Sequence, residues 1–170
     1  MATTGSETET AREVVSEYFD ALAEQDLDRA VACWKPGTID TLYGFGELPA
    51  PDGIRDFFGS MFSTVEEWRF EVLDLLAEGD KVTVRWRAGG KFDGTGSFQG
   101  FVPNGRQVEL EGADVLTVAD GKIVSNFAYT NGMVFAQQIG ALPKPGSAQE
   151  RTMTAAFNAK TAVTKRLSRR

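Results

Sequence analysis

The first sixty residues contain three stretches in which hydrophobic residues recur at the spacing of an α-helix. The first predicted helix begins at Thr8 or Thr10, after a polar stretch over residues 1–7 that we expect to be disordered. Its hydrophobic positions are Val14, Val15, Tyr18, Phe19 and Leu22. Asp26 is the predicted N-cap of a second helix, which carries Leu27, Ala30, Val31 and Trp34 and ends at residues 35–37. The third predicted helix spans residues 53–62.

The remaining pattern predicts strands and two more helices. A short strand is expected at 38–43, followed by a loop at 44–53 that is rich in glycine and proline. Strands then follow over residues 68–76, 81–88, a region around 97–102, 108–118 and 123–130. The turn dipeptides between them are Gly79-Asp80, Asn104-Gly105 and Asp120-Gly121. A helix over 132–139 ends at Gly140, and Ser147 can cap a last helix with a thin hydrophobic face.

This order of elements predicts an α+β fold in which a curved antiparallel sheet wraps around three N-terminal helices. Such a sheet and its helices form a cone-shaped α+β barrel that encloses an apolar cavity. A chain of 170 residues with 42% hydrophobic content can bury one good core. We therefore expect a single domain over residues 8–143 and a basic, partly helical extension over 144–170.

Charge and composition exclude several classes of function. The net charge is −6, and residues 146–170 hold six basic residues and one acidic residue, which leaves −11 for residues 1–145. An acidic body argues against nucleic acid as a partner. No window approaches 18 apolar residues, and the N-terminus lacks an apolar signal core, so we expect a cytoplasmic protein with no membrane span.

The chain has no histidine and one cysteine, Cys33. A zinc site built from Cys and His, a Ser-His-Asp triad and a Cys-His pair are therefore excluded. Acid–base chemistry must come from Asp, Glu, Tyr, Lys or a cofactor. Twelve Phe, three Trp and three Tyr supply ample aromatic surface for a core or for an apolar cavity.

Asp114 is the principal candidate for a functional group, because it lies inside a hydrophobic strand. An unpaired charge in a core costs several kcal/mol, so a carboxylate there points to an active site if it faces the interior. Strand parity then places Gly112, Leu116 and Val118 on the same inner face, with Asn126, Ala128 and Thr130 facing inward from the returning strand. The alternative is a surface acid paired with Arg85 or Arg106. Arg85 and Arg87 alternate with Val84 and Trp86, so we expect both arginines on the outer face.

Several phrases together resemble the nuclear transport factor 2-like superfamily, and within it the SnoaL-like polyketide cyclases and the ketosteroid isomerases. The resemblance covers roughly residues 11–143. The matching phrases are Ala21-Leu22 with Asp26-Leu27-Asp28, Gly53-Ile54-Arg55-Asp56-Phe57-Phe58, Pro103-Asn104-Gly105-Arg106, Asp120-Gly121-Lys122-Ile123-Val124 and Gln137-Gln138-Ile139-Gly140.

The resemblance implies roles for individual residues. Tyr18 matches the isomerase tyrosine that binds the substrate oxyanion, and Asp114 matches the aspartic acid that donates a second hydrogen bond to the same oxygen. The isomerase base would fall near Thr41, which cannot take a carbon-bound proton, while Asp40 is one residue out of phase. The cyclases use a histidine, absent here, and an aspartate whose place is taken by Asn131.

The predicted activity is a cofactor-independent cyclisation or isomerisation of a hydrophobic polyketide- or terpenoid-like molecule in natural-product (antibiotic) biosynthesis. Asp114 and Tyr18 are the expected catalytic residues, with no metal and no cofactor. The expected substrate-binding residues are Trp34, Thr41, Tyr43, Phe58, Phe62, Trp86, Leu116, Asn126, Ala128 and Asn131.

Two alternatives stay open: a ligand-binding or interaction module without turnover, and an epoxide hydrolase. The hydrolase needs an Asp-Arg-Asp constellation, and its last-strand acid aligns with Ala128. We also expect a homodimer through the outer sheet face. The basic tail is a solvated helix, a lid over the cavity, or a contact to an acidic surface of a partner.

Overall fold

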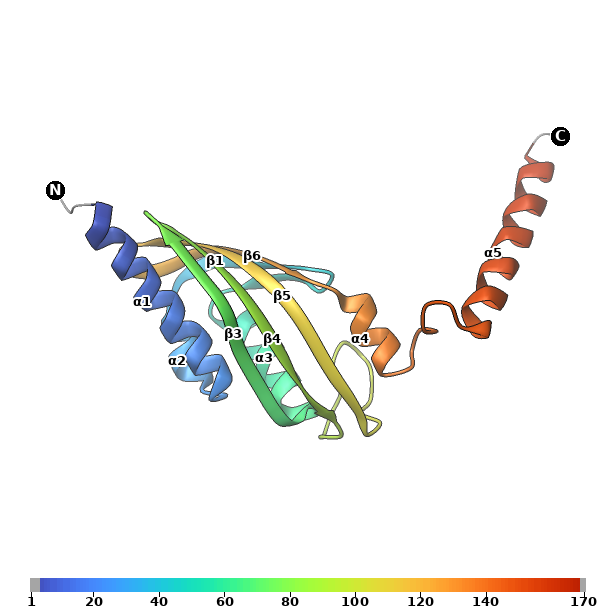
Figure 1. Cartoon of the computed structure of the whole chain (residues 1–170), viewed down its shortest axis with the longest axis horizontal. Helices are drawn as coiled ribbons and strands as arrows, with labels where there is room; N and C mark the ends of the chain where they lie inside the picture. Colours follow the sequence, from blue (N-terminus) through green and yellow to red (C-terminus); the bar gives the residue numbers. More distant parts are fainter. Residues whose placement is uncertain (1–3, 169–170) are drawn as a thin grey trace.

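The computed structural model describes residues 4–168, which form a curved sheet, helices against its concave face and a projecting C-terminal helix (Figure 1). The helices are α1 (Thr4–Ala23), α2 (Leu27–Ala32), α3 (Asp52–Thr64), α4 (Gly132–Gln138) and α5 (Ala148–Leu167). The strands are β1 (Trp34–Tyr43), β2 (Gly46–Pro49), β3 (Glu66–Glu78), β4 (Lys81–Phe92), β5 (Arg106–Ala119) and β6 (Lys122–Thr130). Within this part of the chain, no helix is long and apolar enough to cross a membrane.

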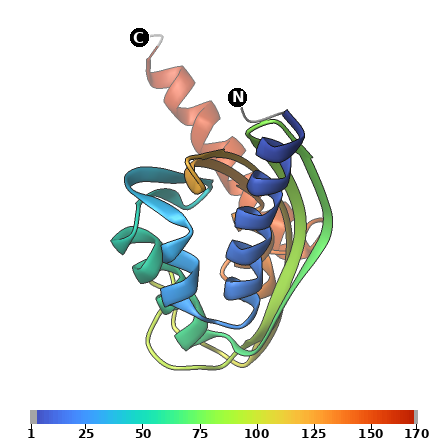
Figure 2. The same cartoon turned by 90° about the vertical axis from the view of Figure 1, so that its left-hand side faces the viewer.

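The six-stranded sheet has the order β2-β1-β6-β5-β4-β3 and is open at both edges. The predicted α+β class and cone shape are confirmed, since the sheet curves around α1 and α3 (Figure 2). The sheet is mixed, which corrects the prediction of a purely antiparallel one, because β1 runs parallel to β6. These two strands are far apart in the sequence, so no hairpin turn fixes their relative direction.

Four local predictions are corrected. Helix α1 begins at Thr4, so residues 4–7 are helical, while residues 1–3 lie outside the described range. Trp34 starts β1 instead of ending the second helix, because Pro36 favours an extended residue before it. The expected loop at 44–53 contains the short strand β2. The region around 97–102 makes only an isolated bridge between Phe98 and Phe101.

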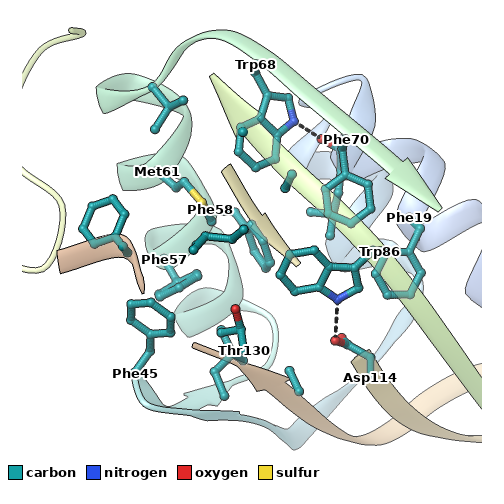
Figure 3. A pocket seen from close by; sticks show the side chains of 18 of the residues that line it. Phe19, Phe45, Phe57, Phe58, Met61, Trp68, Phe70, Trp86, Asp114 and Thr130 are labelled. Carbon is teal, nitrogen blue, oxygen red and sulfur yellow. Dashed lines mark hydrogen bonds between the residues drawn. The ribbon is translucent and has the colours of Figure 1, made fainter. Parts of the chain in front are cut away.

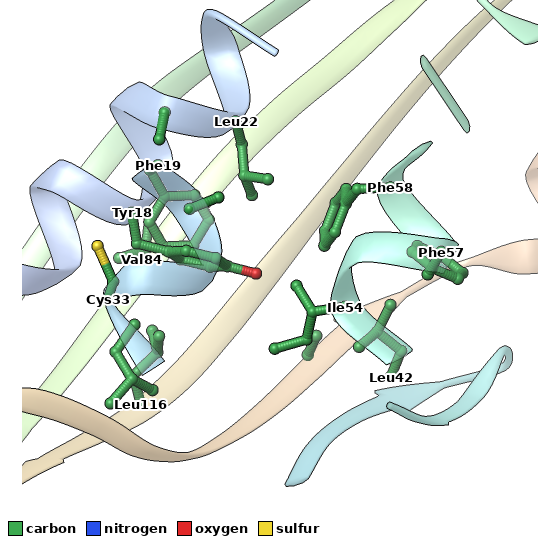
Figure 4. Packing of buried hydrophobic residues seen from close by; sticks show 14 of the residues in the cluster. Tyr18, Phe19, Leu22, Cys33, Leu42, Ile54, Phe57, Phe58, Val84 and Leu116 are labelled. Carbon is green, nitrogen blue, oxygen red and sulfur yellow. The ribbon is translucent and has the colours of Figure 1, made fainter. Parts of the chain in front are cut away.

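The hydrophobic core lies between the concave face of the sheet and the helices. Tyr18 and Leu22 from α1 approach Val84 and Leu116 from the sheet, and Ile54 of α3 packs from the other side (Figure 4). Asp26 caps α2 as predicted, by accepting a hydrogen bond from the Arg29 backbone N–H at 3.0 Å. These contacts fix α1 and α3 against the sheet and leave the space between them to the site described below.

The inner and outer faces of β4 and β5 follow the predicted parity. Leu116 and Val118 are buried on the same side as Asp114. Arg85 and Arg87 are exposed on the outer face, where both form ion pairs with Glu111. The alternative pairing of Asp114 with Arg85 is therefore wrong.

Trp86 lies across Gly112, its direct neighbour on β5. A Cβ at position 112 would come within 2.3 Å of Trp86 Cζ2 and 2.7 Å of Cε2, well inside van der Waals contact. Glycine in a strand is normally destabilising, so its presence here points to this close approach. The missing side chain at 112 allows the indole to lie flat and reach Asp114.

We predict that Gly112→Ala lowers the free energy of unfolding by about 1–3 kcal/mol, because it overpacks the contact with the indole. Urea denaturation measures the change. In a Trp86→Phe background the same substitution should cost less, because the ring atoms that clash are gone. An equal cost in both backgrounds would contradict this explanation.

Candidate functional site

A cavity of about 80 Å³ opens between α1, α3 and the concave sheet face (Figure 3). Ten of its 22 lining residues are aromatic: Tyr18, Phe19, Phe45, Phe57, Phe58, Trp68, Phe70, Trp86, Phe98 and Phe135. Neither lysine nor arginine lines it. The wall is therefore almost wholly apolar, and its few polar side chains determine what chemistry the cavity supports.

Two carboxyl groups, Asp40 of β1 and Asp114 of β5, belong to this wall. The amide of Asn126, on β6 between them, bonds to both: its Nδ2 donates to Asp114 Oδ2 at 2.7 Å and to Asp40 Oδ1 at 3.0 Å. The indole Nε1 of Trp86 donates to Asp114 Oδ1 at 2.7 Å (Figure 3). Asp114 thus has two donors, whereas Asp40 shares one.

The pairing of β1 with β6 turns Asp40 toward the cavity. Asp40 lies opposite Asn126 in this parallel pair, and Thr41 lies opposite Phe127. Because side chains alternate across a strand, Asp40 and Leu42 face inward while Thr41 and Tyr43 face outward. The prediction that Asp40 is out of phase with the cavity is therefore wrong. Thr41 is the residue that faces away from it.

Burial shifts the protonation of all three acidic groups in the cavity. It raises the pKa of Asp40 well above its ordinary value; the nearby Asp114 raises this pKa further, and the bond from Asn126 lowers it. Burial also raises the pKa of Asp114, against the bonds from Trp86 and Asn126 that lower it. With more donors, Asp114 is the better carboxylate of the pair, and Asp40 is the better acid.

Tyr18 contributes a hydroxyl from α1 to the same region (Figure 4). Burial raises its pKa well above the ordinary value, and the charges of Asp40 and Asp114 raise the pKa further, although the indole of Trp34 lowers it. The phenol therefore stays protonated and can donate a hydrogen bond to a ligand oxygen.

The structure brings five of the predicted site residues to the cavity wall: Asp114, Tyr18, Phe58, Trp86 and Ala128. Asn126 lies just behind the wall, where its amide joins the two carboxyls. Trp34 packs edge-on against Tyr18, and Phe62 against Trp68, so both support the wall from outside the cavity.

The other four predicted contacts lie elsewhere. Leu116 is fully buried in the core. Thr41 and Tyr43 are on the outer face, where Tyr43 stacks on Tyr129 with ring centroids 4.7 Å apart. Asn131 caps α4 by accepting hydrogen bonds from the backbone N–H groups of Met133 and Val134. Asn131 therefore has a structural role as the N-cap of α4, a position at which asparagine is common.

Sequence reasoning missed most of the aromatic wall and discarded Asp40. The phase of β1 depends on its partner strand, and no local signal fixes that pairing. Helical periodicity marks Phe19 and Leu22 as inward, but it cannot separate a core position from a cavity wall.

Comparison with known proteins now identifies the family. Residues 15–126 match the SnoaL-like domain, and the chain belongs to this family. The expected membership of the nuclear transport factor 2-like superfamily is thereby confirmed. A search of curated proteins found no match to the chain.

Solved structures share the fold at low sequence identity. A protein from Jannaschia sp. CCS1 named as a SnoaL-like polyketide cyclase is 23% identical, with a TM-score of 0.70 over 81% of this chain and 96% of its own. AclR from Streptomyces galilaeus, named as a hydroxylase, is 19% identical, with a TM-score of 0.70 over 94% of this chain and 97% of its own. TerC, co-crystallised with polyporic acid, is 17% identical, with a TM-score of 0.61 over 76% and 98%.

The raised pKa of Asp40 predicts a pH-dependent stability. Between the ordinary and the raised pKa, the folded protein binds more protons than the unfolded chain, so stability falls as pH rises through this window. Asp40→Asn keeps a neutral acceptor for Asn126 and removes the titration. We predict that the variant gains stability relative to the parent from pH 4 toward pH 8, as measured by urea denaturation.

Asp74→Asn is the matched control, because Asp74 is an exposed acid paired with Arg85 on the outer face. It should show no such gain. A difference between Asp40→Asn and the parent that stays constant across this pH range would contradict the assignment.

Proposed function

We propose that the chain is a cofactor-independent enzyme that cyclises or isomerises a hydrophobic, polyketide- or terpenoid-like small molecule. The observation that carries the proposal is the pair of buried carboxyls, joined by one amide, at the wall of an aromatic cavity. Two titratable groups whose surroundings separate their proton affinities supply an acid and a base at neutral pH.

The cavity favours an uncharged substrate with aromatic or alicyclic rings. Its walls offer ring faces and no cation, so a phosphate or carboxylate would lose hydration without gaining a partner. The relatives named as polyketide cyclases support a ligand of this kind. The proposed hydrophobic substrate is thus the kind of molecule that an aromatic wall without cations binds.

Each polar side chain takes one part of the proposed reaction. The substrate carbonyl oxygen accepts hydrogen bonds from the Tyr18 hydroxyl and from protonated Asp40. Asp114 accepts the proton of the nucleophile, which is a carbon or hydroxyl group farther along the same substrate molecule. The nucleophilic atom then bonds to the carbonyl carbon, and the oxygen takes the proton of Asp40. Asp114 has then gained a proton and Asp40 has lost one, and the product is an isomer of the substrate. Transfer of a proton from Asp114 back to Asp40 restores the starting state of the site.

The aromatic wall contributes orientation. A flexible substrate held between Phe58, Phe70 and Trp86 has fewer conformations to lose before ring closure, and such alignment supplies a large share of an intramolecular rate. The apolar wall also excludes water from the charged intermediate, which strengthens the hydrogen bonds to its oxygen.

The alternatives make different demands on the same cavity. An epoxide hydrolase of the Asp-Arg-Asp type needs an arginine between two acids, whereas the described cavity wall contains no arginine and presents Ala128 where the last-strand acid is expected. A binding module without turnover needs no acid–base pair. The buried carboxyls, which are costly to a mere binder, favour the enzyme.

We predict that Asp114→Asn lowers kcat by about 10²- to 10⁴-fold, because the proton acceptor is lost. Tyr18→Phe should lower it by roughly 10- to 100-fold through loss of one hydrogen bond to the oxygen. Ring closure of a panel of small linear polyketides is followed by absorbance and mass spectrometry. Ligand affinity is read from the fluorescence of Trp68 and Trp86, which line the cavity.

Asp74→Asn again serves as control and should leave kcat unchanged. Ligand affinity of Asp114→Asn should stay within a few-fold, because Trp86 and Asn126 can still bond to an amide at this position. A parent protein that binds panel members tightly but forms no product, with Asp114→Asn losing only affinity, would support the binding module instead.

A further inference from the structure

Thr130 places a hydroxyl in the cavity that the proposed reaction does not use. Among the described residues that line the cavity, four carry oxygen in the side chain: Tyr18, Asp40, Asp114 and Thr130. The first three take part in the reaction proposed above. Thr130 ends β6 on its inner face, and its hydroxyl points into the cavity (Figure 3). It is therefore a polar group without an assigned role in a wall that is otherwise almost wholly apolar.

The Thr130 hydroxyl has only a long hydrogen bond within the described part of the chain. Its Oγ1 donates to the backbone carbonyl of Glu111 at 3.5 Å. Hydroxyl groups normally donate to oxygen at about 2.5–3.0 Å, so this bond is weak. A ligand oxygen at an ordinary distance is the better partner, and the hydroxyl can donate to it or accept from it.

Strand register fixes where Thr130 lies relative to the buried carboxyls. Thr130 pairs with Gly112 of β5, and Ala128 pairs with Asp114. Thr130 and Asp114 are therefore diagonal neighbours on one sheet face, a relation that places two residues about 7–8 Å apart. Ala128 lies between them on β6 and contributes only a methyl group, which leaves space above it. The cavity thus has two polar ends with a gap between them.

The indole of Trp86 bridges this gap as a flat surface. Its Cζ2 and Cε2 atoms lie over Gly112, the partner of Thr130, and its Nε1 donates to Asp114 at 2.7 Å. Aromatic rings favour offset stacking on such a surface. A ring stacked on this indole has one edge near Asp114 and the opposite edge near Thr130.

We propose that Thr130 is a specificity-determining residue that binds a second oxygen of the substrate. This oxygen lies across a ring, or across the chain that closes into one, from the carbonyl that binds Tyr18 and Asp40. The inference rests on the proposed function, because it adds a feature to the substrate of that reaction. A neutral hydroxyl suits a ketone, phenol or alcohol oxygen, whereas a carboxylate would need a cation, and neither lysine nor arginine lines the described cavity.

Two small probes test this recognition by binding alone. para-Hydroxyacetophenone carries a carbonyl and, across one benzene ring, a hydroxyl group, and acetophenone lacks the hydroxyl. NMR titration gives the dissociation constants of both probes for the parent, Thr130→Val and Thr130→Ser. Loss of one hydrogen bond should lower the preference for the hydroxylated probe about 3- to 10-fold in Thr130→Val. Thr130→Ser keeps the hydroxyl and should keep most of the preference.

Thr117→Val is the matched control, because Thr117 lies on the outer face of β5, where its hydroxyl accepts a hydrogen bond from Lys81. It should leave both dissociation constants unchanged. Acetophenone should bind Thr130→Val within about twofold of the parent, because its proposed contacts do not include this hydroxyl. The proposal is overturned by an equal preference in the parent and Thr130→Val, by a Thr130→Ser variant that behaves like Thr130→Val, or by a parent that binds neither probe.

Kinetics separates this inference from the proposed reaction. With panel members that carry a second oxygen, Thr130→Val should raise KM about 3- to 10-fold and change kcat little, because the bond exists in the ground and transition states alike. Asp114→Asn lowers kcat instead. A probe preference that depends on Thr130 in a protein without turnover would reject the reaction and support Thr130 as a ligand contact. Normal turnover without that preference would reject the role of Thr130 alone.

Discussion

The shared amide of Asn126 is the interaction on which the site depends. Two carboxyl groups this close and this buried cannot both be ionised without a large electrostatic cost. Asn126 donates to each of them, and the indole of Trp86 gives Asp114 one donor more. The difference of a single hydrogen bond separates an acid, Asp40, from a carboxylate, Asp114. The rest of the fold holds three neighbouring strands in the register that makes this arrangement possible.

Register explains how remote features of the chain serve the site. The parallel pairing of β1 with β6 sets Asp40 beside Asn126, and the antiparallel pairing of β5 with β6 sets Asp114 on its other side. Gly112 leaves room for the Trp86 ring, which in turn reaches Asp114. The helices then close an aromatic cavity over these groups, and the polar atoms stay few and fixed. This is the preorganisation that proton transfer in an apolar cavity requires.

Much of this fold follows from local pattern, and the site follows only in part. From the sequence alone, the period-two alternation around Asp114 and the hairpin turns predict β4, β5 and β6 and the residues on their inner faces. Helical spacing likewise placed Tyr18 toward the sheet. The sequence does not identify Asp40 as a cavity residue, because a strand more than eighty residues away determines which side chains of β1 face inward. The prediction of Tyr43 as a substrate contact is wrong for the same reason. The prediction of Asn131 is wrong because an asparagine that caps a helix and one that binds a substrate look alike in a sequence.

The central claim is that the pair of buried carboxyls binds one proton at neutral pH, and that Asp40 carries this proton while Asp114 is ionised. Carbon-13 NMR of protein labelled at the aspartate side-chain carboxyls tests it most directly, with Asp40→Asn and Asp114→Asn used to assign the two signals. The account predicts that the Asp40 signal titrates well above the ordinary range for aspartate, and that its pKa falls when Asp114 is made neutral. Two signals that both titrate as exposed aspartates do, and independently of each other, would contradict it.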